Sequence, residues 1–572
     1  MIDLRLERVH IVTLIALVAV ISTVFATDKV LFHGVITAKY FWFAVAISVV
    51  SLFMPFSISR KNEIHVADIL FGVFSVYVCF NYFCLNSHPD MHWWLTLLIF
   101  PLYIAVRSLS GNEMFRRLLV VAFLLVVFVQ AIWGLMQLYG FLSSWHAFYK
   151  ITGGFFNPGP YSGFVATGVP LALHYLFDKT ASRWERWLSV GVLAASFLIL
   201  PAAMSRAAWI AAFVGCIFVL WKCFESSSFK LMIIVAGLIA LVMLSGAYFL
   251  KKDSADGRIV IWSASMEAIK ERPFFGAGYG KFTTVYGDAQ AEYFLKKERK
   301  PAQIMVADSP EYAFNEYLQI TVELGIVGLL LFLSLIVSCF VNLRSLTAVH
   351  YPLTAILIFA VFSYPFSVLP LAILFVFLMG LIAPYSKKIS FNLPVWLQIL
   401  GITLCLAITA YGAYQIIAKR AAYLEWSELQ TNDNYMQATE QFASLYPHLR
   451  HNKIFLFQYG QSLSQTGQHA ESNRLYEEYL NYGSDPMVYN CMGNNFKEME
   501  QYVQAEKMYI RALQIVPNRH YPLYLLMKLY MDTGEIEKAK IMAKLLLEKP
   551  VKVQSSAIRE MQEEARELRI EN

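Results

Sequence analysis

The side chains best suited to chemistry in this sequence lie in three short polar segments that interrupt long apolar blocks. The first is Gly153–Ser162, a loop rich in Gly and Pro in which Asn157 and Tyr161 can form hydrogen bonds. The second is Ser205–Arg206, and the third is the polar stretch 251–316. Polar groups at a membrane boundary are costly, which favours a functional role. For the first segment, a plain turn is the competing interpretation.

Arg206 is the most unusual of the cations, because apolar stretches lie on both sides of it. A guanidinium in this setting can simply snorkel to the lipid headgroups. It can also bind a diphosphate through two parallel hydrogen bonds. The second interpretation predicts a phosphate-containing ligand at the membrane surface, and the sequence leaves both interpretations open.

The polar stretch 251–316 begins with Arg258 and Trp262 and continues through Pro273 to a turn at Gly276–Gly278. These glycines do not form a dinucleotide-binding fingerprint, because neither a preceding strand nor a βαβ unit supports one. The stretch therefore predicts a shaped loop that carries a second arginine, and no nucleotide cofactor.

Carboxylates gather where this stretch meets the next apolar block. Asp308, Glu311 and Glu316 precede the block, and Tyr317 begins it. Glu323 follows Glu316 by two helical turns, so both carboxylates share one helix face. A carboxylate at that depth must face protein or water. Glu323 is therefore either part of a catalytic site or a structural partner of an arginine.

Composition explains why such residues stand out. The chain has 572 residues, 57% hydrophobic and only 15% charged, whereas soluble proteins average about 45–50% apolar and about 25% charged residues. A net charge of +6 gives no case for nucleic acid binding. The seven cysteines form no CxxC or metal-ligand spacing, so no metal or cofactor is predicted.

The elements that must position these residues are transmembrane helices, each needing about 20 apolar residues. We predict an all-α fold, a polytopic bundle of twelve or thirteen spans. The apolar blocks lie near residues 8–26, 40–57, 66–84, 92–107, 116–139, 160–177, 187–204, 206–222, 230–250, 317–341, 351–367, 369–384 and 395–415. The predicted organisation is spans one to nine in 1–250, a loop in 251–316, four spans in 317–415 and a separate domain in 416–572.

Lys and Arg residues orient the bundle, because cytoplasmic loops carry an excess of them. With the N-terminus in the cytoplasm, the inside connections hold Arg5, Arg8, Arg60, Lys61, Arg107, Arg116, Arg117, Lys179, Arg183, Arg186, Lys222, Lys230, Arg344, Lys387 and Lys388. The short outside connections hold Lys29, Lys39, Lys150 and Arg206. This bias places the loop 251–316 and the C-terminal domain outside.

The C-terminal domain shows an internal repeat of 33–34 residues between 452 and 550. Its clearest unit has Gly493, Ala505, Tyr509, Ala512 and Pro517. Small and aromatic residues at this spacing match the tetratricopeptide pattern of two packed helices. Such repeats commonly bind a partner protein on a concave surface. The alternative is a structural cap on the membrane region.

The polar segments together resemble the O-antigen ligase superfamily of bacterial membrane glycosyltransferases, over roughly residues 60–385. The resemblance rests on four elements in the family's order. They are the loop Gly154-Phe155-Phe156-Asn157-Pro158, the pair Ser205-Arg206, Arg258 with Trp262 before Pro273 and the Gly276/Gly278 turn, and Asn315-Glu316-Tyr317-Leu318-Gln319 followed by Glu323-Leu324-Gly325-Ile326.

The resemblance implies a metal-independent transfer of a glycan from undecaprenyl diphosphate, on the periplasmic side of the bacterial inner membrane. It implies that Arg206 and Arg258 bind the donor diphosphate, with Asn157, Tyr161 and Tyr317 nearby. The acceptor it implies is a hydroxyl on lipid A core, on a protein, or on a growing glycan as in a polymerase. An outward repeat domain mildly favours a macromolecular acceptor or partner.

One position departs from the family. Where the family often has a histidine before Asn-Glu-Tyr-Leu-Gln, this chain has Phe314. A general base would then have to be Asp308, Glu311 or Glu316. Otherwise the reaction depends on diphosphate departure and positioning, or the chain is an inactive member. The loop at Asn157 also lacks the family's second asparagine.

Two other classes of protein compete with an enzyme. A transporter or flippase fits a bundle with few charges, but transporters tend to have two related halves with a site at the midplane. The sequence shows no such symmetry, and its distinctive charges gather at the outer surface. A non-catalytic scaffold that uses the repeats is the third interpretation.

Overall fold

The computed structural model describes residues 2–57, 63–85, 88–224, 237, 252–296, 301–341, 346–389, 394–429 and 435–570. These residues are almost entirely helical, as the composition predicts. The helices of the membrane region are α1 (Ile2–Ile21), α2 (Gly34–Ser57), α3 (Val66–Leu85), α4 (Met91–Ser110), α5 (Glu113–Leu138), α6 (Pro158–Phe177), α7 (Arg183–Ala202), α8 (Arg206–Cys223), α13 (Glu316–Phe340), α14 (His350–Val361), α15 (Leu369–Ile382) and α16 (Val395–Ile417).

Within the described ranges, eight helices are long and apolar enough to cross a membrane, and three apolar helices are shorter. The long ones are α2, α3, α4, α5, α7, α8, α13 and the helix that begins in α16. The predicted span near 160–177 is the helix α6 but falls outside both groups. The predicted span at 230–250 lies outside the described residues. The chain is therefore a multi-pass membrane protein.

The predicted spans 351–367 and 369–384 are shorter than expected. At 1.5 Å per residue, α14 and α15 are about 18 and 21 Å long, less than the ~30 Å hydrocarbon core. Between them, the 3₁₀ turn η4 (Pro365–Ser367) replaces helix. Pro365 lacks a backbone N–H and restricts Tyr364 before it, so α14 ends early. The segment that joins the two short helices is buried at Ser363, Tyr364 and Pro365.

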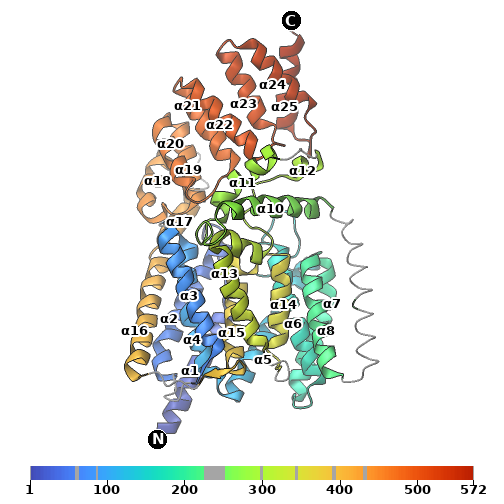
Figure 1. Ribbon diagram of the computed structural model, residues 1–572, viewed down its shortest axis with the longest axis vertical. Coiled ribbons are helices and arrows are strands. Elements are labelled where there is room, and N and C mark those ends of the chain that lie inside the picture. Colours follow the sequence, from blue (N-terminus) through green and yellow to red (C-terminus); the bar gives the residue numbers. More distant parts are fainter. Residues whose placement is uncertain are drawn as a thin grey trace.

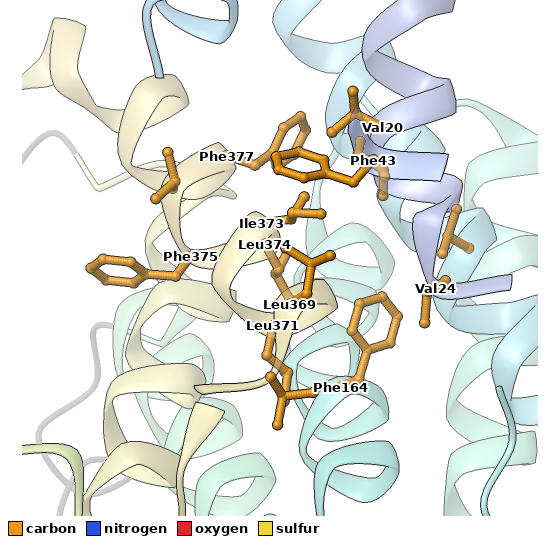
Figure 2. Packing of buried hydrophobic residues seen from close by; sticks show 14 of the residues in the cluster. Val20, Val24, Phe43, Phe164, Leu369, Leu371, Ile373, Leu374, Phe375 and Phe377 are labelled. Carbon is orange, nitrogen blue, oxygen red and sulfur yellow. The ribbon is translucent and has the colours of Figure 1, made fainter. Parts of the chain in front are cut away.

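Helix α15 is the centre of the core. All fourteen of its residues are buried, because helices of the bundle surround it on every side. Figure 2 shows Phe377 and Leu374 of this helix near side chains from α1, α2 and α6, whereas Phe375 points away from them. A helix that is apolar all round is stable only in such a position, and it gives the turn η4 a fixed support.

Helix α13 is broken at Gly325, which has φ 68° and ψ −173°. The break frees backbone groups that pair with the turn after residue 273. The Ala277 amide donates to Val322 O at 2.8 Å, and the Ile326 amide donates to Pro273 O at 2.9 Å. A Cβ on Gly325 would lie 2.1 Å from Phe274 O, so only glycine fits. Gly276 and Gly325 thus lock the loop onto the bundle.

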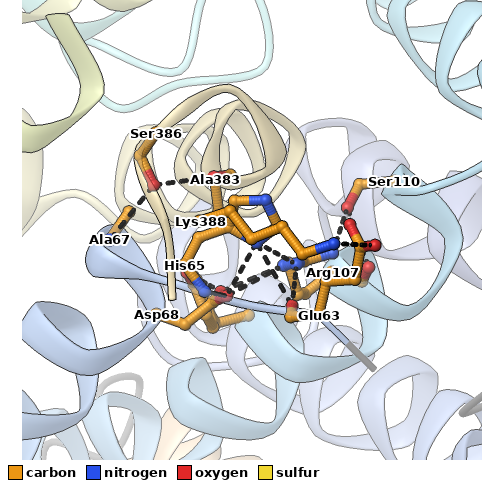
Figure 3. A network of polar contacts seen from close by, with 10 residues as sticks. Glu63, His65, Ala67, Asp68, Arg107, Ser110, Ala383, Ser386 and Lys388 are labelled. Carbon is orange, nitrogen blue, oxygen red and sulfur yellow. Dashed lines mark hydrogen bonds and ion pairs between the residues drawn. The ribbon is translucent and has the colours of Figure 1, made fainter. Parts of the chain in front are cut away.

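The bundle end near the N-terminus carries a polar network (Figure 3). Strands β1 (Ile64–His65) and β2 (Lys388–Ile389) pair antiparallel there. Arg107 donates to Asp68 at 3.0 Å and to the Glu63 carbonyl at 2.8 Å. These contacts join the ends of α3, α4 and α15, and they give the cations predicted for the inside connections a structural role.

The opposite end carries the polar stretch and the C-terminal helices (Figure 1). Helix α10 (Lys252–Glu271) lies across the end of the bundle, with α11 (Phe282–Lys296) and α12 (Pro301–Val306) beyond it. The remaining helices are α17 (Arg420–Leu429), α18 (Tyr435–Leu449), α19 (Lys453–Gln465), α20 (His469–Tyr479), α21 (Pro486–Glu498), α22 (Tyr502–Ile515), α23 (Tyr521–Asp532), α24 (Ile536–Glu548) and α25 (Ser556–Ile570).

The C-terminal helices stack as hairpins with a recurring contact. A Cβ on Gly460 would lie 2.5 Å from the ring of Tyr476, and a Cβ on Gly493 would lie 2.3 Å from the ring of Tyr509. Both partners move by the same 33 residues between the two hairpins, as the period in the sequence predicts. Glycine at the first position is what allows the aromatic ring of the second helix to approach.

The stack is firmly docked on the polar stretch. The Ser484 amide donates to Thr283 O at 3.1 Å, and Gln290 Nε2 donates to Ile515 O at 2.6 Å. Arg519 forms an ion pair with Asp308 at 2.7 Å. The C-terminal domain therefore contributes walls and charges to this end of the membrane region.

Candidate functional site

Two cavities lie at the end of the bundle that carries the polar stretch and the C-terminal helices. The first has a volume of about 380 Å³, and we call it the cationic cavity. Its described lining includes three basic side chains and no carboxylate: Leu138, Phe148, Tyr149, Lys150, Ile151, Asn157, Pro158, Gly159, Ala202, Ala203, Met204, Ser205, Arg206, Ala207, Ser254 and Arg258. Asn157, Arg206 and Arg258, which lie apart in the sequence, meet here.

Arg206 is held at the corner between α7 and α8. The chain reverses at Met204, whose φ of 52° is uncommon for a residue with a side chain. Trp209 Nε1 donates to Leu200 O at 2.7 Å, which ties α8 back to the end of α7. This corner fixes Arg206 as the first residue of α8, at the mouth of the cavity.

The loop before α6 is held by two glutamines of α5. Gln137 Oε1 accepts from the Gly153 amide at 2.7 Å, and Gln130 Oε1 accepts from the Gly154 amide at 3.1 Å. A Cβ on Gly154 would lie 2.5 Å from Val24 O, so the loop packs tightly on the bundle. The loop positions Asn157, whose side chain accepts from the Gly159 amide at 2.9 Å and caps α6.

Arg258 comes from α10 and lies against residue 314. Its guanidinium carbon is 5.3 Å from the centre of the Phe314 ring. Burial, together with the charge of Arg206, lowers the pKa of Arg258 from its ordinary value. Both guanidiniums line the same cavity, where like charges repel each other. An anion between them would relieve this repulsion.

The backbone at Phe314 is in the left-handed region, with φ 52°. Neighbouring hydrogen bonds hold it there. Trp262 Nε1 donates to Ala313 O at 3.0 Å, Gln319 Oε1 accepts from the Ala313 amide at 3.2 Å, and Asn315 Oδ1 accepts from the Leu318 amide at 3.0 Å. The Asn-Glu-Tyr-Leu-Gln motif and Trp262 thus aim residue 314 at Arg258.

Two helices begin at the cationic cavity. Asn157 precedes α6, and Ser205 precedes α8. Helix N-termini carry partial positive charge, which favours anions. At α6 only this dipole acts, because Pro158 and Pro160 have no N–H and the Gly159 amide already donates to Asn157 Oδ1. Together with Lys150, Arg206 and Arg258, these helix ends make a site suited to a ligand with several negative charges.

The second cavity has a volume of about 480 Å³ and lies between the bundle and the first C-terminal hairpins; we call it the aromatic cavity. Its ring-bearing side chains include Phe71, Phe74, Trp93, Tyr279, Tyr312, Phe332, Phe375, Tyr423 and Tyr482. Its ionisable lining residues are Asp90, Glu311, Glu316, Glu323, Lys419, Lys453, His33, His88, His92, His448 and His451, together with tyrosines.

Glu316 and Glu323 both line the aromatic cavity and both bind backbone amides. Glu316 Oε1 accepts from the Phe366 amide at 2.6 Å and so holds the turn η4 against α13. Glu323 Oε2 accepts from the Gly280 amide at 2.9 Å. Glu323 therefore has a structural role, which was one of the two interpretations of the sequence. It binds a backbone amide, however, and not an arginine.

The remaining predicted site residues lie elsewhere. Tyr161 is fully buried, and its hydroxyl donates to Gln130 O at 3.1 Å. Tyr317 donates to Leu357 O at 3.1 Å. Asp308 pairs with Arg519 and lines neither cavity. The structure therefore places none of these three predicted site residues in the lining of either cavity.

Lys150 and Ser254 are cavity residues that sequence reasoning missed. Lys150 was counted only for orientation, although it directly precedes the Gly-rich loop. The contributions of Asn452 and Lys453 to the aromatic cavity had no signal, because they depend on how the C-terminal domain docks.

The O-Antigen ligase family model matches residues 191–333, the part of the chain that contains Arg206, Arg258, Phe314 and the break in α13. The chain is also similar to a protein of Rickettsia bellii (strain RML369-C) named "Putative polysaccharide ligase". The two are 35% identical over 105 residues, which cover 18% of this chain and 24% of that relative. The match thus spans about a quarter of the relative's length. Both similarities connect this part of the chain with polysaccharide ligases of the O-antigen ligase type, and the apolar helices make the chain a multi-pass membrane protein.

Proposed function

We propose that this chain is a membrane glycosyltransferase that moves a glycan from undecaprenyl diphosphate to an acceptor hydroxyl. The observation that carries the proposal is the cationic cavity, where Lys150, Arg206 and Arg258 meet the N-termini of α6 and α8. Such an arrangement binds a diphosphate through charge-assisted hydrogen bonds and helix dipoles. The name of the relative from Rickettsia bellii agrees with transfer of a polysaccharide.

The chemistry follows from the leaving group. The acceptor oxygen bonds to the anomeric carbon of the donor glycan, and the bond from that carbon to the diphosphate oxygen breaks. The electron pair leaves with the diphosphate, and the hydroxyl gives its proton to a base. Two guanidiniums fixed before the reaction stabilise the negative charge that develops on the diphosphate.

Glu316 is our candidate for the base. Its carboxylate lines the aromatic cavity next to the segment that carries Phe314, whereas Asp308 is exposed and paired with Arg519. Phe314 has no ionisable group and packs on Arg258, so in this chain residue 314 positions the donor site and does not transfer a proton.

The orientation of the chain in the membrane is part of the same proposal. The N-terminal end with its excess of Lys and Arg faces the cytoplasm, and the cavities and the C-terminal domain face the periplasm of a bacterial inner membrane. The Gly–Tyr contacts that recur every 33 residues support tetratricopeptide-type repeats. In this fold they cap the membrane region, and a partner protein on their free surface is a further expectation.

Ligation and polymerisation share this donor chemistry and differ in the acceptor. A flippase would carry the lipid without breaking the bond to the diphosphate, so release of the diphosphate separates it from both enzymes. A scaffold would neither bind the donor nor depend on the arginines.

The test uses purified full-length protein with an undecaprenyl-diphosphate-linked glycan and, in separate reactions, core lipid, acceptor protein or glycan. Release of undecaprenyl diphosphate is followed for wild type and for Arg258→Ala. Arg272→Ala is the matched control, because Arg272 follows the same helix, is exposed and lines neither cavity. We expect release by wild type and the control, and loss in Arg258→Ala. Equal release by all three proteins would refute the proposal.

A further inference from the structure

The aromatic cavity changes from polar to apolar along its length. On α4 it begins at Asp90 and His92, passes Thr96 and ends at Ile99 and Phe100. At 1.5 Å per residue, ten residues of helix correspond to about 15 Å of depth. The cavity therefore reaches from the outer surface well into the membrane region.

Apolar side chains from three helices of the membrane region line the deep part of the cavity. Phe71 and Phe74 come from α3, Phe332 and Leu335 from α13, and Phe375 from α15. None of them offers a hydrogen bond, so this part suits a hydrocarbon chain. A ligand that fills the whole cavity has one polar and one apolar end.

The first C-terminal hairpins form the roof of the cavity. The described lining there includes Asn452, Lys453 and Tyr482. Lys453 forms an ion pair with Glu311, and His451 Nδ1 lies 2.7 Å from the hydroxyl of Tyr482. Hydroxyl, amide and carboxylate groups interleaved with aromatic rings are the groups that hydrogen-bond and stack on sugars.

The charge of this lining argues against a phosphate-rich ligand. Its carboxylates, Asp90, Glu311, Glu316 and Glu323, outnumber its lysines, Lys419 and Lys453. Burial lowers the pKa of His451 to about 4, so this imidazole adds no charge at neutral pH. A diphosphate would find no excess of cations here, whereas a neutral sugar needs none.

A wall of aromatic side chains in contact with one another separates the two cavities. Tyr312 lines the aromatic cavity and stacks on Tyr364 at 4.1 Å, and Tyr364 meets the Phe314 ring at 5.2 Å. Phe314 in turn packs on Arg258 in the cationic cavity. Residues 312 to 316 thus face one ligand site and then the other.

We propose that the aromatic cavity is the acceptor site, and that it takes the neutral terminal sugars of a lipid-anchored glycan. The sugars lie under the C-terminal hairpins beside Glu316, and the apolar anchor extends along α3 and α15. This inference rests on the proposed function only in calling the bound glycolipid the acceptor. The binding of a neutral glycolipid can be tested without it.

The test uses full-length protein in nanodiscs and a neutral disaccharide on an alkyl chain that carries a diazirine. After illumination, labelled peptides are mapped by mass spectrometry. Two further probes carry the same chain, one with a phosphate headgroup and one with a serine-containing peptide. We expect the neutral disaccharide probe to label α3, α4 and α13, with about tenfold weaker labelling by the other two.

Neighbouring positions on α3 provide the variant and its control. Ser75 lines the cavity, whereas Val76 beside it is 69% exposed on the outside of the bundle. Ser75→Trp fills the cavity and lowers labelling by the disaccharide probe about tenfold, and Val76→Trp leaves it unchanged. Undecaprenyl diphosphate binding, measured separately, stays intact in Ser75→Trp and falls in Arg258→Ala.

The outcomes separate the two proposals. Selective labelling that Ser75→Trp abolishes supports the glycolipid site, even if no transfer is ever observed. Equal labelling by all probes, stronger labelling by the peptide or phosphate probe, or labelling that Ser75→Trp does not change overturns it. Transfer activity with labelling outside the cavity would overturn this inference and leave the proposed function standing.

Discussion

Three cations and no carboxylate form the ionisable part of the described lining of the cationic cavity, apart from Tyr149, whereas carboxylates outnumber lysines in the aromatic cavity. The N-termini of α6 and α8 line the first cavity, and those of α4, α13 and α19 line the second. The second instead has an apolar depth and a roof from another domain. Under the proposed function, this difference separates a charged leaving group from a neutral nucleophile at one end of the bundle.

The same contrast explains why the connecting segment is so strongly tied down. Asn315, Glu316 and Gln319 each accept a hydrogen bond from a backbone amide within or beside the wall between the cavities. A shift of about 1 Å in a positioned reacting group can cost about 10²-fold in rate. We therefore expect residues 315 to 319 to hold the groups of both sites in position.

The largest effect is expected when an arginine of the cationic cavity is removed. Arg206→Ala and Arg258→Ala each lower the rate of diphosphate release by about 10²–10³-fold, because each removes a fixed donor to developing charge. The double variant falls by less than the product of the two, since both cations act on one anion. Single-turnover kinetics at saturating acceptor measure this. Full additivity would show that the arginines serve separate ligands.

A smaller effect is expected from Glu316→Gln in the aromatic cavity. The amide oxygen can still accept from Phe366, so the turn η4 is kept while the base is lost. Loss of a general base costs about 10²-fold in rate. The pH–rate profile should lose its acidic limb, and undecaprenyl diphosphate should bind as in wild type. An unchanged profile would assign the proton to another group.

The roof of the aromatic cavity should loosen in acid. Burial is the main cause that lowers the pKa of His451 to about 4, with Lys419, Arg450 and His88 adding to it. An unfolded histidine titrates near 6.5, so the stability from this neutral imidazole is complete above pH ~6.5 and is lost as pH falls toward ~4. Hydrogen exchange in α19 should therefore accelerate over this range. His451→Gln should show less of this change, and an equal change would contradict the assignment.

The smallest effect is expected from Asp308→Asn. Asp308 is exposed, and its ion pair with Arg519 joins two surface side chains. Exposed pairs contribute about 0–1 kcal/mol. Transfer activity should stay within about twofold of wild type, and thermal unfolding should barely change. A large loss of activity would return Asp308 to the catalytic role that its place in the sequence suggested.

Much of the fold could be predicted from sequence, because the signals are local. Long apolar blocks identified the helices, and the change in composition after residue 415 marked where the C-terminal helices begin. The early end of α14 was missed, although Pro365 was its signal, because an apolar block shows hydropathy and not helix length.

The candidate site was predictable only in part. The arginines stood out because charge is rare among apolar residues, and their shared side of the membrane placed them together. Tyr161 looked like a ligand-binding residue because its loop is polar, yet a ring buried against Gly134 and Gly153 is a packing residue. The aromatic cavity is lined by both α4 and α19, which lie far apart in the sequence, and no local pattern in the sequence predicts that they share a cavity.

The most direct test of the account is a structure of the full-length protein with undecaprenyl diphosphate bound, determined by electron cryomicroscopy in nanodiscs. The account predicts the diphosphate in the cationic cavity, within hydrogen-bond distance of both Arg206 and Arg258, with the aromatic cavity left to the acceptor. A diphosphate in the aromatic cavity, or one that contacts neither arginine, would contradict it.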